Sequence, residues 1–322
     1  MPSITYLHHR KINGDLLEVS PDKAGFQGII FFIYQALKRN FSQCRIVSGV
    51  FSIPSVGCLM RMLCNRWSKN QYRFWADITL AKNYARQFSY YLKNNKTDCA
   101  LVTQAKYLSF LKCSQFKVAW LDGLHSQIDL NYPGGSLLSR YTIQNLKELD
   151  RLAVQNADLL VFASQWAATY AINEMKADKR KVCVIPWGAN LDSKNTRSSI
   201  KMMINQKKRD ICNLLFCGVH WKRKGGDIAI RIIEYLNHKE FPVQLFLIGV
   251  EPPQSLPIPN NVIKVGYINK MISGSRILSD YYEKSHFLLL PTRAEAFGIV
   301  LCEANSCGLP CIQRTWGGLR RL

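Results

Sequence analysis

Short apolar runs alternate with longer amphipathic segments along most of this chain. The runs are apolar throughout rather than alternating, which is typical of parallel strands covered on both faces. In the first half they fall at residues 4–8, 44–49, 99–104, 117–122, 159–164 and 181–186. Helical periodicity between them, clearest over residues 137–157, predicts a parallel sheet flanked by helices.

The same rhythm restarts after a polar stretch at residues 191–210, which has no clear period and which we interpret as a linker. Further apolar runs lie at residues 213–219, 243–250, 262–268, 287–292 and 309–315, and residues 225–238 are amphipathic. We therefore predict an α/β protein with two Rossmann-like, doubly wound parallel-sheet domains at 1–192 and 211–322, with a linker at 193–210. Ligands of such folds bind beyond the carboxyl ends of the strands, and the cleft between the domains is the expected site.

Charge narrows the expected partners. The net charge is +21, with local crowding of Lys and Arg at residues 61–73, 176–181, 207–209 and 221–226. Such charge attracts phosphate-bearing molecules, for example nucleotides or anionic lipids. The chain has no zinc finger, no RNA-binding signature and no basic heptad helix, so we expect no nucleic-acid partner.

Cysteines and apolar segments indicate the compartment. None of the eleven Cys forms a CxxC pair, so we expect reduced, mostly buried thiols. The first fifteen residues are not a signal peptide, and the longest apolar run, residues 28–37, is too short to span a bilayer. We expect a cytoplasmic protein, either free or peripheral at the inner face of a membrane.

The stretch "PTRAEAFGIVLCEANSCGLP" at 291–310 carries the strongest chemical signal. A predicted strand exits at Pro291, and the segment "FGIVLCEANSCG" at 297–308 then starts a predicted helix. Glu295 stands before that helix and Glu303 about a turn and a half inside it. The free N–H groups at a helix start bind phosphate, which leaves one carboxylate for sugar hydroxyls on each side. The alternative is that Glu295 is a capping acid and Glu303 an exposed helix acid.

Here the sequence resembles the retaining glycosyltransferases of family 4 (group 1), which have the GT-B fold and carry Glu-x7-Glu after such a strand. The match includes Phe297-Gly298 and Gly308-Leu309-Pro310. The resemblance implies that Glu295 is catalytic and holds donor-sugar hydroxyls, and that Glu303 holds the ribose hydroxyls. It also implies that the backbone contacts the sugar and diphosphate at Phe297, Gly298, Ile299 and Val300.

A second motif, "LLFCGVHWKRKGGD" at 214–227, follows another predicted strand. Lys224 falls at the family's spacing for a lysine that neutralises the diphosphate leaving group. The family's arginine is replaced by Val219, and Arg223 is our candidate for the second cation. The alternative is a solvated basic loop.

Two weaker matches complete the expected donor site. By the resemblance, main chain near Tyr267 and Ile268 reads the nucleotide base, although Tyr267 fits equally well as a core residue. A glycine-containing loop before the first long helix faces the donor phosphates, and Gly28 occupies that position. The alternative is that Gly28 only starts the helix.

The stretch "WLDGLHSQIDLNYPG" at 120–134 follows a strand of the first domain, on the acceptor side. Asp122 and His125 are the ionisable groups expected to meet the acceptor or the donor sugar. A His can hydrogen-bond a sugar or take up a proton near neutral pH. The alternative is a capping Asp and an exposed His.

The implied activity is transfer of a sugar, with retained configuration, from a nucleoside diphosphate sugar to a hydroxyl of a glycan or lipid-linked acceptor, as in polysaccharide or glycolipid synthesis. No Asp-x-Asp occurs, so we expect neither a metal nor another cofactor. A Rossmann dehydrogenase is excluded because GxGxxG is missing after the first strand.

An alternative within the same fold is an impaired or inactive sugar-nucleotide-binding remnant. Family members continue beyond the position of Gly317-Gly318 with a further strand and helices. The resemblance therefore implies that the second domain is incomplete in this sequence, less stable than usual and impaired in closure unless another chain completes it.

Overall fold

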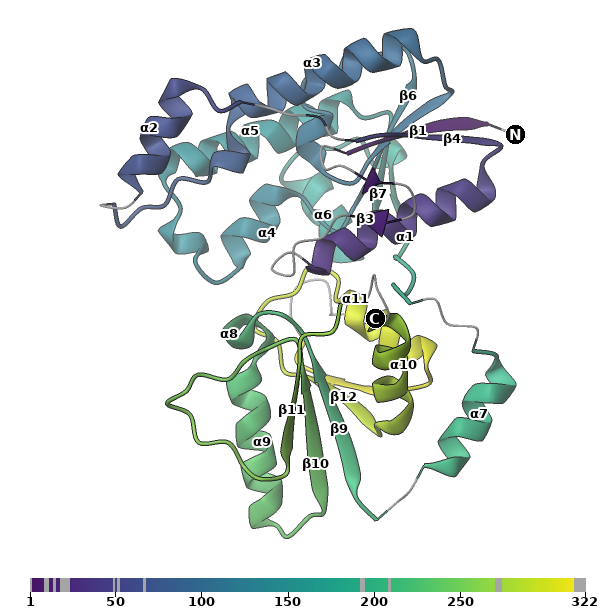
Figure 1. Ribbon diagram of the computed structural model, residues 1–322. Helices are drawn as coiled ribbons and strands as arrows, with labels where there is room; N and C mark the ends of the chain where they lie inside the picture. The colour runs from purple at the N-terminus through teal and green to yellow at the C-terminus, as the bar shows by residue number, and fades with distance from the viewer. Residues whose placement is uncertain are drawn as a thin grey trace. The chain divides into compact units, whose positions relative to one another are not determined.

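The computed structural model describes residues 2–8, 12–13, 16–17, 24–48, 50, 53–65, 68–191, 195–207, 210–269 and 274–315. Gly317-Gly318 lies outside these residues. The chain forms two compact units that divide after Pro186, and the start of the first long helix, up to Ile29, groups with the second unit. Their elements are labelled in Figure 1.

The first domain is built on a six-stranded parallel sheet of order β4-β1-β5-β6-β7-β8. Its core is formed by apolar residues of the strands and of the helices packed on them, for example Phe88, Leu121 and Phe162, all at most 1% exposed. The strands are β1 (Ser3–Leu7), β4 (Gln43–Val47), β5 (Cys99–Val102), β6 (Phe116–Leu121), β7 (Leu159–Phe162) and β8 (Val182–Val184).

Side-chain caps define where several helices of the first domain begin. Asp77 accepts the Thr79 N–H at 2.8 Å, Ser139 accepts from Thr142, and Ser164 accepts from Ala167. The helices are α1 (Ala24–Asn40), α2 (Val56–Cys64), α3 (Ile78–Asn94), α4 (His125–Asn131), α5 (Arg140–Asn156) and α6 (Gln165–Asn173), with single 3-10 turns at Phe74–Ala76, Ala105–Tyr107, Gly135–Leu137 and Lys179–Lys181.

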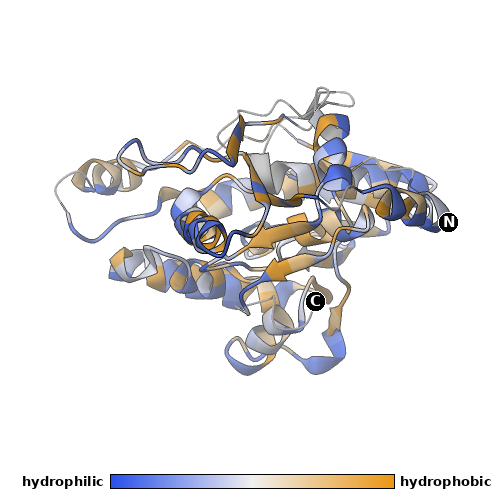
Figure 2. Cartoon of the chain, turned by 90° about the horizontal axis from the view of Figure 1, so that it is seen from below, coloured by the Kyte–Doolittle hydropathy of each residue, from blue (hydrophilic) through white to orange (hydrophobic). Residues whose placement is uncertain are grey.

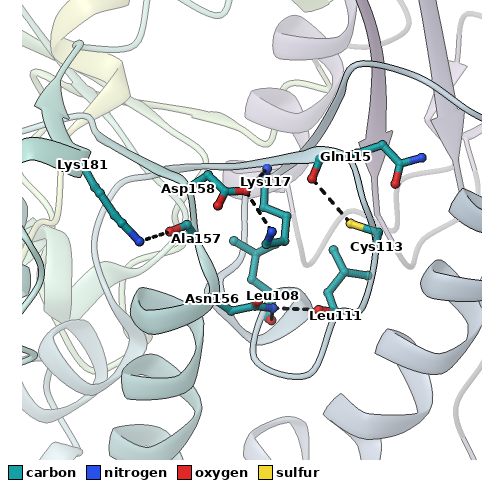
Figure 3. A network of polar contacts seen from close by, with 9 residues as sticks. All are labelled: Leu108, Leu111, Cys113, Gln115, Lys117, Asn156, Ala157, Asp158 and Lys181. Atoms are coloured by element: carbon teal, nitrogen blue, oxygen red, sulfur yellow. Dashed lines mark hydrogen bonds and ion pairs between the residues drawn. The ribbon is translucent and has the colours of Figure 1, made fainter.

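A polar network ties together the starts of β6, β7 and β8 (Figure 3). Asp158 accepts from both the backbone N–H and the Nζ of Lys117 at 2.8 Å. Lys181 Nζ donates to the Ala157 carbonyl at 3.1 Å, and Asn156 Nδ2 donates to the Leu108 carbonyl at 2.7 Å. These bonds hold together the amino-terminal ends of three neighbouring strands. The carboxyl ends, where such folds bind ligands, lie at the opposite end of the sheet.

The second domain holds a five-stranded parallel sheet of order β11-β10-β9-β12-β13. The chain first winds outward from β9 through β10 to β11 and then returns to the other side of β9. The loops after β9 and β12 therefore flank the switch point of this sheet, where such folds bind ligands. The strands are β9 (Cys212–Cys217), β10 (Val243–Ile248), β11 (Val262–Gly266), β12 (Phe287–Leu290) and β13 (Cys311–Gln313).

The helices of the second domain are α7 (Arg197–Gln206), α8 (Trp221–Lys224), α9 (Gly226–His238), α10 (Ser275–Lys284) and α11 (Ile299–Ser306). In Figure 2 the strands are mostly orange, whereas the helices carry both blue and orange positions. This is the pattern expected when helices cover both faces of an apolar sheet.

All eleven predicted strands occur, each shortened by one or two residues at the carboxyl end. Residues 191–210, which we interpreted as a linker without a clear period, contain α7, which begins with a reciprocal cap between Thr196 and Ser199. A short antiparallel pair, β2 (Ile12–Asn13) with β3 (Leu16–Leu17), was not predicted. Within the described residues, no helix is long and apolar enough to cross a bilayer.

Candidate functional site

The loop after β9 and the loop after β12 are bonded to each other at the switch point. The Arg223 carbonyl accepts the Arg293 N–H at 2.8 Å and the Thr292 hydroxyl at 3.1 Å. Gly225 has φ of 80°, and a Cβ there would stand 2.1 Å from the Pro291 carbonyl oxygen. Only glycine permits this contact. The close approach of the two loops therefore depends on Gly225.

Lys224 and Glu295 form an ion pair where these loops meet. Each residue is 8% exposed. Arg223 lies beside them, with Nη1 at 3.5 Å from Glu295 Oε2 and at 3.0 Å from the Ala294 carbonyl oxygen, to which it donates. Lys224 is thus no solvated loop residue and Glu295 no capping acid; two cations face one buried carboxylate.

The surroundings of this pair are electropositive. Burial lowers the pKa of the neighbouring His220, and the positive charges of Arg223 and Lys224 lower it further. A neutral imidazole beside two cations leaves a net positive charge that suits an anionic ligand. His220 was not among the residues predicted from the sequence, although it lies within the second motif.

Helix α11 begins beside Glu295. Gly298 is its N-cap residue, with φ of 79°, and has no side chain that could occupy the first N–H groups. Phe297 is 2% exposed and packs edge-on against Trp187, with ring centroids 5.7 Å apart. Val300 is buried, and Ile299 is half-buried. The helix start is therefore well anchored and has the polarity that binds phosphate.

Trp187 is a further polar donor at this place. It is 4% exposed, and its Nε1 has no hydrogen-bond partner. Buried indole N–H groups usually have one. Trp187 could not be predicted from the sequence because nothing in the order of residues indicates that it packs on Phe297.

Glu303 lies deeper than expected. It is 1% exposed, and its Oε2 accepts a hydrogen bond from the Tyr282 hydroxyl at 2.9 Å. Burial first, and then the charge of Glu303, raise the pKa of Tyr282 well above its ordinary value, so the phenol remains a donor. Glu303 is not an exposed helix acid, and Tyr282, from α10, is a further residue that was not predicted from the sequence.

A further contact between the loops after β9 and β12 is the ion pair of Arg293 with Asp227, next to the buried pair of Lys224 and Glu295. Arg293 holds the Asp227 carboxylate through two hydrogen bonds of 2.7 Å and donates to the Lys222 carbonyl at 2.7 Å. The bonds from Arg293 lower the pKa of Asp227 to about 2. This bidentate pair fastens the Glu295 loop to the first turn of α9.

The remaining donor-side candidates lie on other elements. Tyr267 follows β11 and is 40% exposed, so it is not a core residue. Ile268 is partly buried against the second domain's core. Gly28 lies inside α1 and not in a loop before it or at its start, because the long apolar run that follows extends the helix back to Ala24.

His125 and Asp122 belong to the first domain, at the carboxyl end of β6. His125 is the first residue of α4, and its Nδ1 lies 3.5 Å from Asp129 Oδ2. Burial by itself disfavours the charged ring, but Asp129 and Asp150 outweigh it and raise the pKa of His125. His125 is therefore a partnered group and not a bare surface imidazole. Asp122 is half-buried.

Two residues that the sequence analysis missed support His125. Asp150, fully buried on α5, accepts the Ser126 N–H at 2.6 Å and so holds the start of α4. Lys106 is 7% exposed, and its Nζ lies 5.8 Å from the centre of the Trp75 ring, which in turn packs against His125 at 5.1 Å. In the part of the chain that the structure describes, no three His, Cys, Asp or Glu gather as a metal site requires.

Residues 212–322 match the family model of the glycosyl transferases group 1. The match lies within the second domain alone. The match begins at the first residue of β9 and includes both motifs that build the buried pair. The matched family is the one that the motifs resemble.

Relatives of known sequence resemble about half of the chain. An uncharacterized 41.2 kDa protein in the cps region of Klebsiella pneumoniae is 24% identical over 51% of this chain and 44% of its own length. The D-inositol 3-phosphate glycosyltransferase of Xylanimonas cellulosilytica is 25% identical over 52% and 43%. The chain therefore aligns with less than half of either relative.

Solved structures establish the fold over nearly all of the chain. WaaG, a glycosyltransferase involved in lipopolysaccharide biosynthesis, is 15% identical with a TM-score of 0.61, covering 98% of this chain and 82% of that one. Anabaena HepE in complex with UDP and glucose is 15% identical with a TM-score of 0.57, covering 99% and 82%. The predicted GT-B fold of two Rossmann-like domains is confirmed.

Replacing Tyr282 tests how the second domain supports Glu303. We expect Tyr282→Phe to lower the free energy of unfolding by about 1–3 kcal/mol, because a buried carboxylate loses a donor. Urea denaturation measures this. Tyr281→Phe, on the adjacent and only partly buried tyrosine, is the matched control; equal losses in the two variants would contradict the role of the Tyr282 hydroxyl.

The Arg293–Asp227 pair predicts a pH dependence. We expect Asp227→Asn to cost about 1 kcal/mol of unfolding free energy at neutral pH, since both side chains are mostly buried. The pKa of Asp227 is lowered to about 2 in the folded domain, so the stabilisation is full above about pH 4 and lost as the pH falls through about 2. Urea curves of both proteins should converge over that range; a constant difference would contradict the assignment.

Proposed function

We propose that this chain is a retaining glycosyltransferase that transfers a sugar from a nucleoside diphosphate sugar to an acceptor hydroxyl. The observation that carries the proposal is the buried pair of Lys224 and Glu295 at the switch point of the second sheet, beside the start of α11. A cation, a carboxylate and free helix N–H groups match the phosphate and hydroxyl groups of a sugar nucleotide. The group 1 family match supports it.

The proposed chemistry needs charge neutralisation more than a protein nucleophile. The bond between the anomeric carbon and the diphosphate oxygen breaks, and the bond to the acceptor oxygen forms on the same face. The leaving diphosphate oxygen takes the acceptor's proton. Lys224, Arg223 and the α11 N–H groups stabilise the charge that grows on the diphosphate, without a metal or other cofactor.

The donor is held by groups of both loops. Glu295 binds hydroxyls of the transferred sugar, Glu303 the ribose hydroxyls, and the backbone from Phe297 to Val300 the sugar and diphosphate. Main chain near Tyr267 and Ile268 meets the base, and Gly28 meets the phosphates from α1. Donor binding must exchange the internal Lys224–Glu295 contact for contacts with phosphate and sugar.

We propose that the first domain receives the acceptor, a glycan or a lipid-linked glycan in polysaccharide or glycolipid synthesis. His125, whose pKa is raised by its acidic neighbours against the effect of burial, and Asp122 would hydrogen-bond acceptor or sugar hydroxyls. The net charge of +21 supports an anionic membrane surface as a partner. The protein would then work in the cytoplasm, peripheral at the inner face of that membrane.

The test is release of nucleoside diphosphate from a panel of UDP-, GDP- and ADP-sugars, with Glu295→Ala as the control protein. We expect release from one base class and its loss in the variant. Binding of a nucleoside diphosphate without release from any donor would favour a sugar-nucleotide-binding remnant. Absence of both would refute the proposal.

A further inference from the structure

Helix α2, Val56–Cys64, turns its apolar side chains away from the first domain. Val56, Met60 and Leu63 are 77%, 57% and 62% exposed, and Ile53, just before the helix, is 83% exposed. Their spacing of three and four residues places them on one face of a helix. We call these four residues the outer stripe. A surface helix normally packs such a stripe on the core, and a cluster of exposed apolar side chains marks an interaction site.

The opposite face of α2 fixes this orientation. Cys58 is fully buried, and the Tyr72 hydroxyl lies 3.3 Å from its Sγ. The Arg61 guanidinium lies 4.0 Å from the centre of the Tyr141 ring. Asn65 exchanges two hydrogen bonds of 2.6 Å with the backbone of Tyr72. The polar and small residues of α2 therefore attach the helix to the first domain, and these contacts orient the outer stripe away from the domain.

The charge around α2 indicates what covers the stripe. Residues 23–76 contain eight Lys and Arg and no Asp or Glu. Lys69 and Arg73 are exposed close to α2, which Figure 1 shows at the edge of the first domain, far from the N-terminal end of β1. A second copy of this chain would bring the same positive charge against the face. Anionic lipid headgroups would neutralise it, and the stripe would enter the acyl boundary.

We propose that the outer stripe and its basic neighbours dock this protein on an anionic lipid bilayer. This proposal rests on the proposed function, which includes an anionic membrane as a partner, and it assigns that partner to one surface of the protein. A lipid-linked acceptor lies in the same bilayer, so docking would raise its local concentration at the first domain. Binding combines a salt-sensitive attraction with apolar insertion, and both parts are required.

Vesicle flotation of the full chain tests the proposal. The probes are vesicles of phosphatidylcholine alone and vesicles containing about one-third phosphatidylglycerol, each at low salt and at about 0.5 M salt, where attraction is screened. We expect binding to anionic vesicles at low salt only. The triple variant Val56→Gln, Met60→Gln, Leu63→Gln should bind them at least tenfold more weakly.

The matched control places the same change on exposed apolar residues of the second domain: Met202→Gln, Tyr235→Gln and Ile277→Gln. It should bind vesicles as the unaltered protein does. Equal vesicle binding by both triple variants would overturn the proposal, as would a stripe variant that changes only from dimer to monomer in light scattering. Binding of nucleoside diphosphate, measured without vesicles, should be equal in the unaltered protein and the stripe variant; it reports on the proposed function separately, so either can fail alone.

Discussion

Replacing Glu295 by Gln is expected to reduce turnover about 100-fold or more while leaving nucleoside diphosphate affinity intact or several-fold tighter. Turnover and diphosphate affinity respond differently because Glu295 forms a buried ion pair with Lys224. Glu295 accepts a hydrogen bond from Lys224, so the lysine proposed to bind phosphate already has an anionic partner. The amide cannot hold the ammonium as the carboxylate does, and Lys224 becomes available to the diphosphate.

Two measurements check this expectation: steady-state turnover of the donor found in the sugar panel, and calorimetry with the corresponding nucleoside diphosphate. Glu240→Gln is the matched control, since Glu240 is an exposed acid in the turn before β10, at the other end of the sheet. If the Glu295 variant lost diphosphate affinity together with turnover, the carboxylate would not be a competitor for Lys224. The proposed exchange of partners would then be wrong.

The parts of the fold that follow from local pattern could be predicted. Buried parallel strands are apolar throughout, so every strand of both sheets was visible as a run. α7 was missed because residues 191–210 are mostly polar and its apolar positions are few. Met202 and Ile204 remain 62% and 46% exposed even in the structure, so no strong periodic face marks this helix.

The candidate site, too, could be predicted from the sequence only in part. Glu295, Lys224 and Gly298 could be found because each has a fixed place after a strand or before a helix. Their pairing could not, because the ion pair joins residues 71 positions apart and depends on β9 and β12 being neighbours. The same holds for Tyr282, which reaches Glu303 only because α10 and α11 pack in one core. Strand order and helix packing decide such contacts, and neither is a local property.

Replacing Lys224 by Met should separate stability from catalysis at this site. The change removes the charge and keeps an unbranched apolar side chain that can lie against Gly218 as the lysine does. A buried carboxylate then loses its closest cation, and we expect the free energy of unfolding to fall by about 3 kcal/mol. Arg223, at 3.5 Å from Glu295 Oε2, limits the loss. Turnover should fall about 100-fold to 1,000-fold.

The double variant Lys224→Met, Glu295→Gln distinguishes the two roles. It removes both charges, so most of the lost stability should return, while turnover and diphosphate affinity should stay low because no ammonium faces the phosphates. Lys222→Met is the control: its side chain is 74% exposed and touches Asp227 only at 3.4 Å, so both quantities should change little. Recovery of turnover in the double variant would mean that Lys224 only offsets the charge of Glu295, and that the cation for the diphosphate has to be sought elsewhere in the loop.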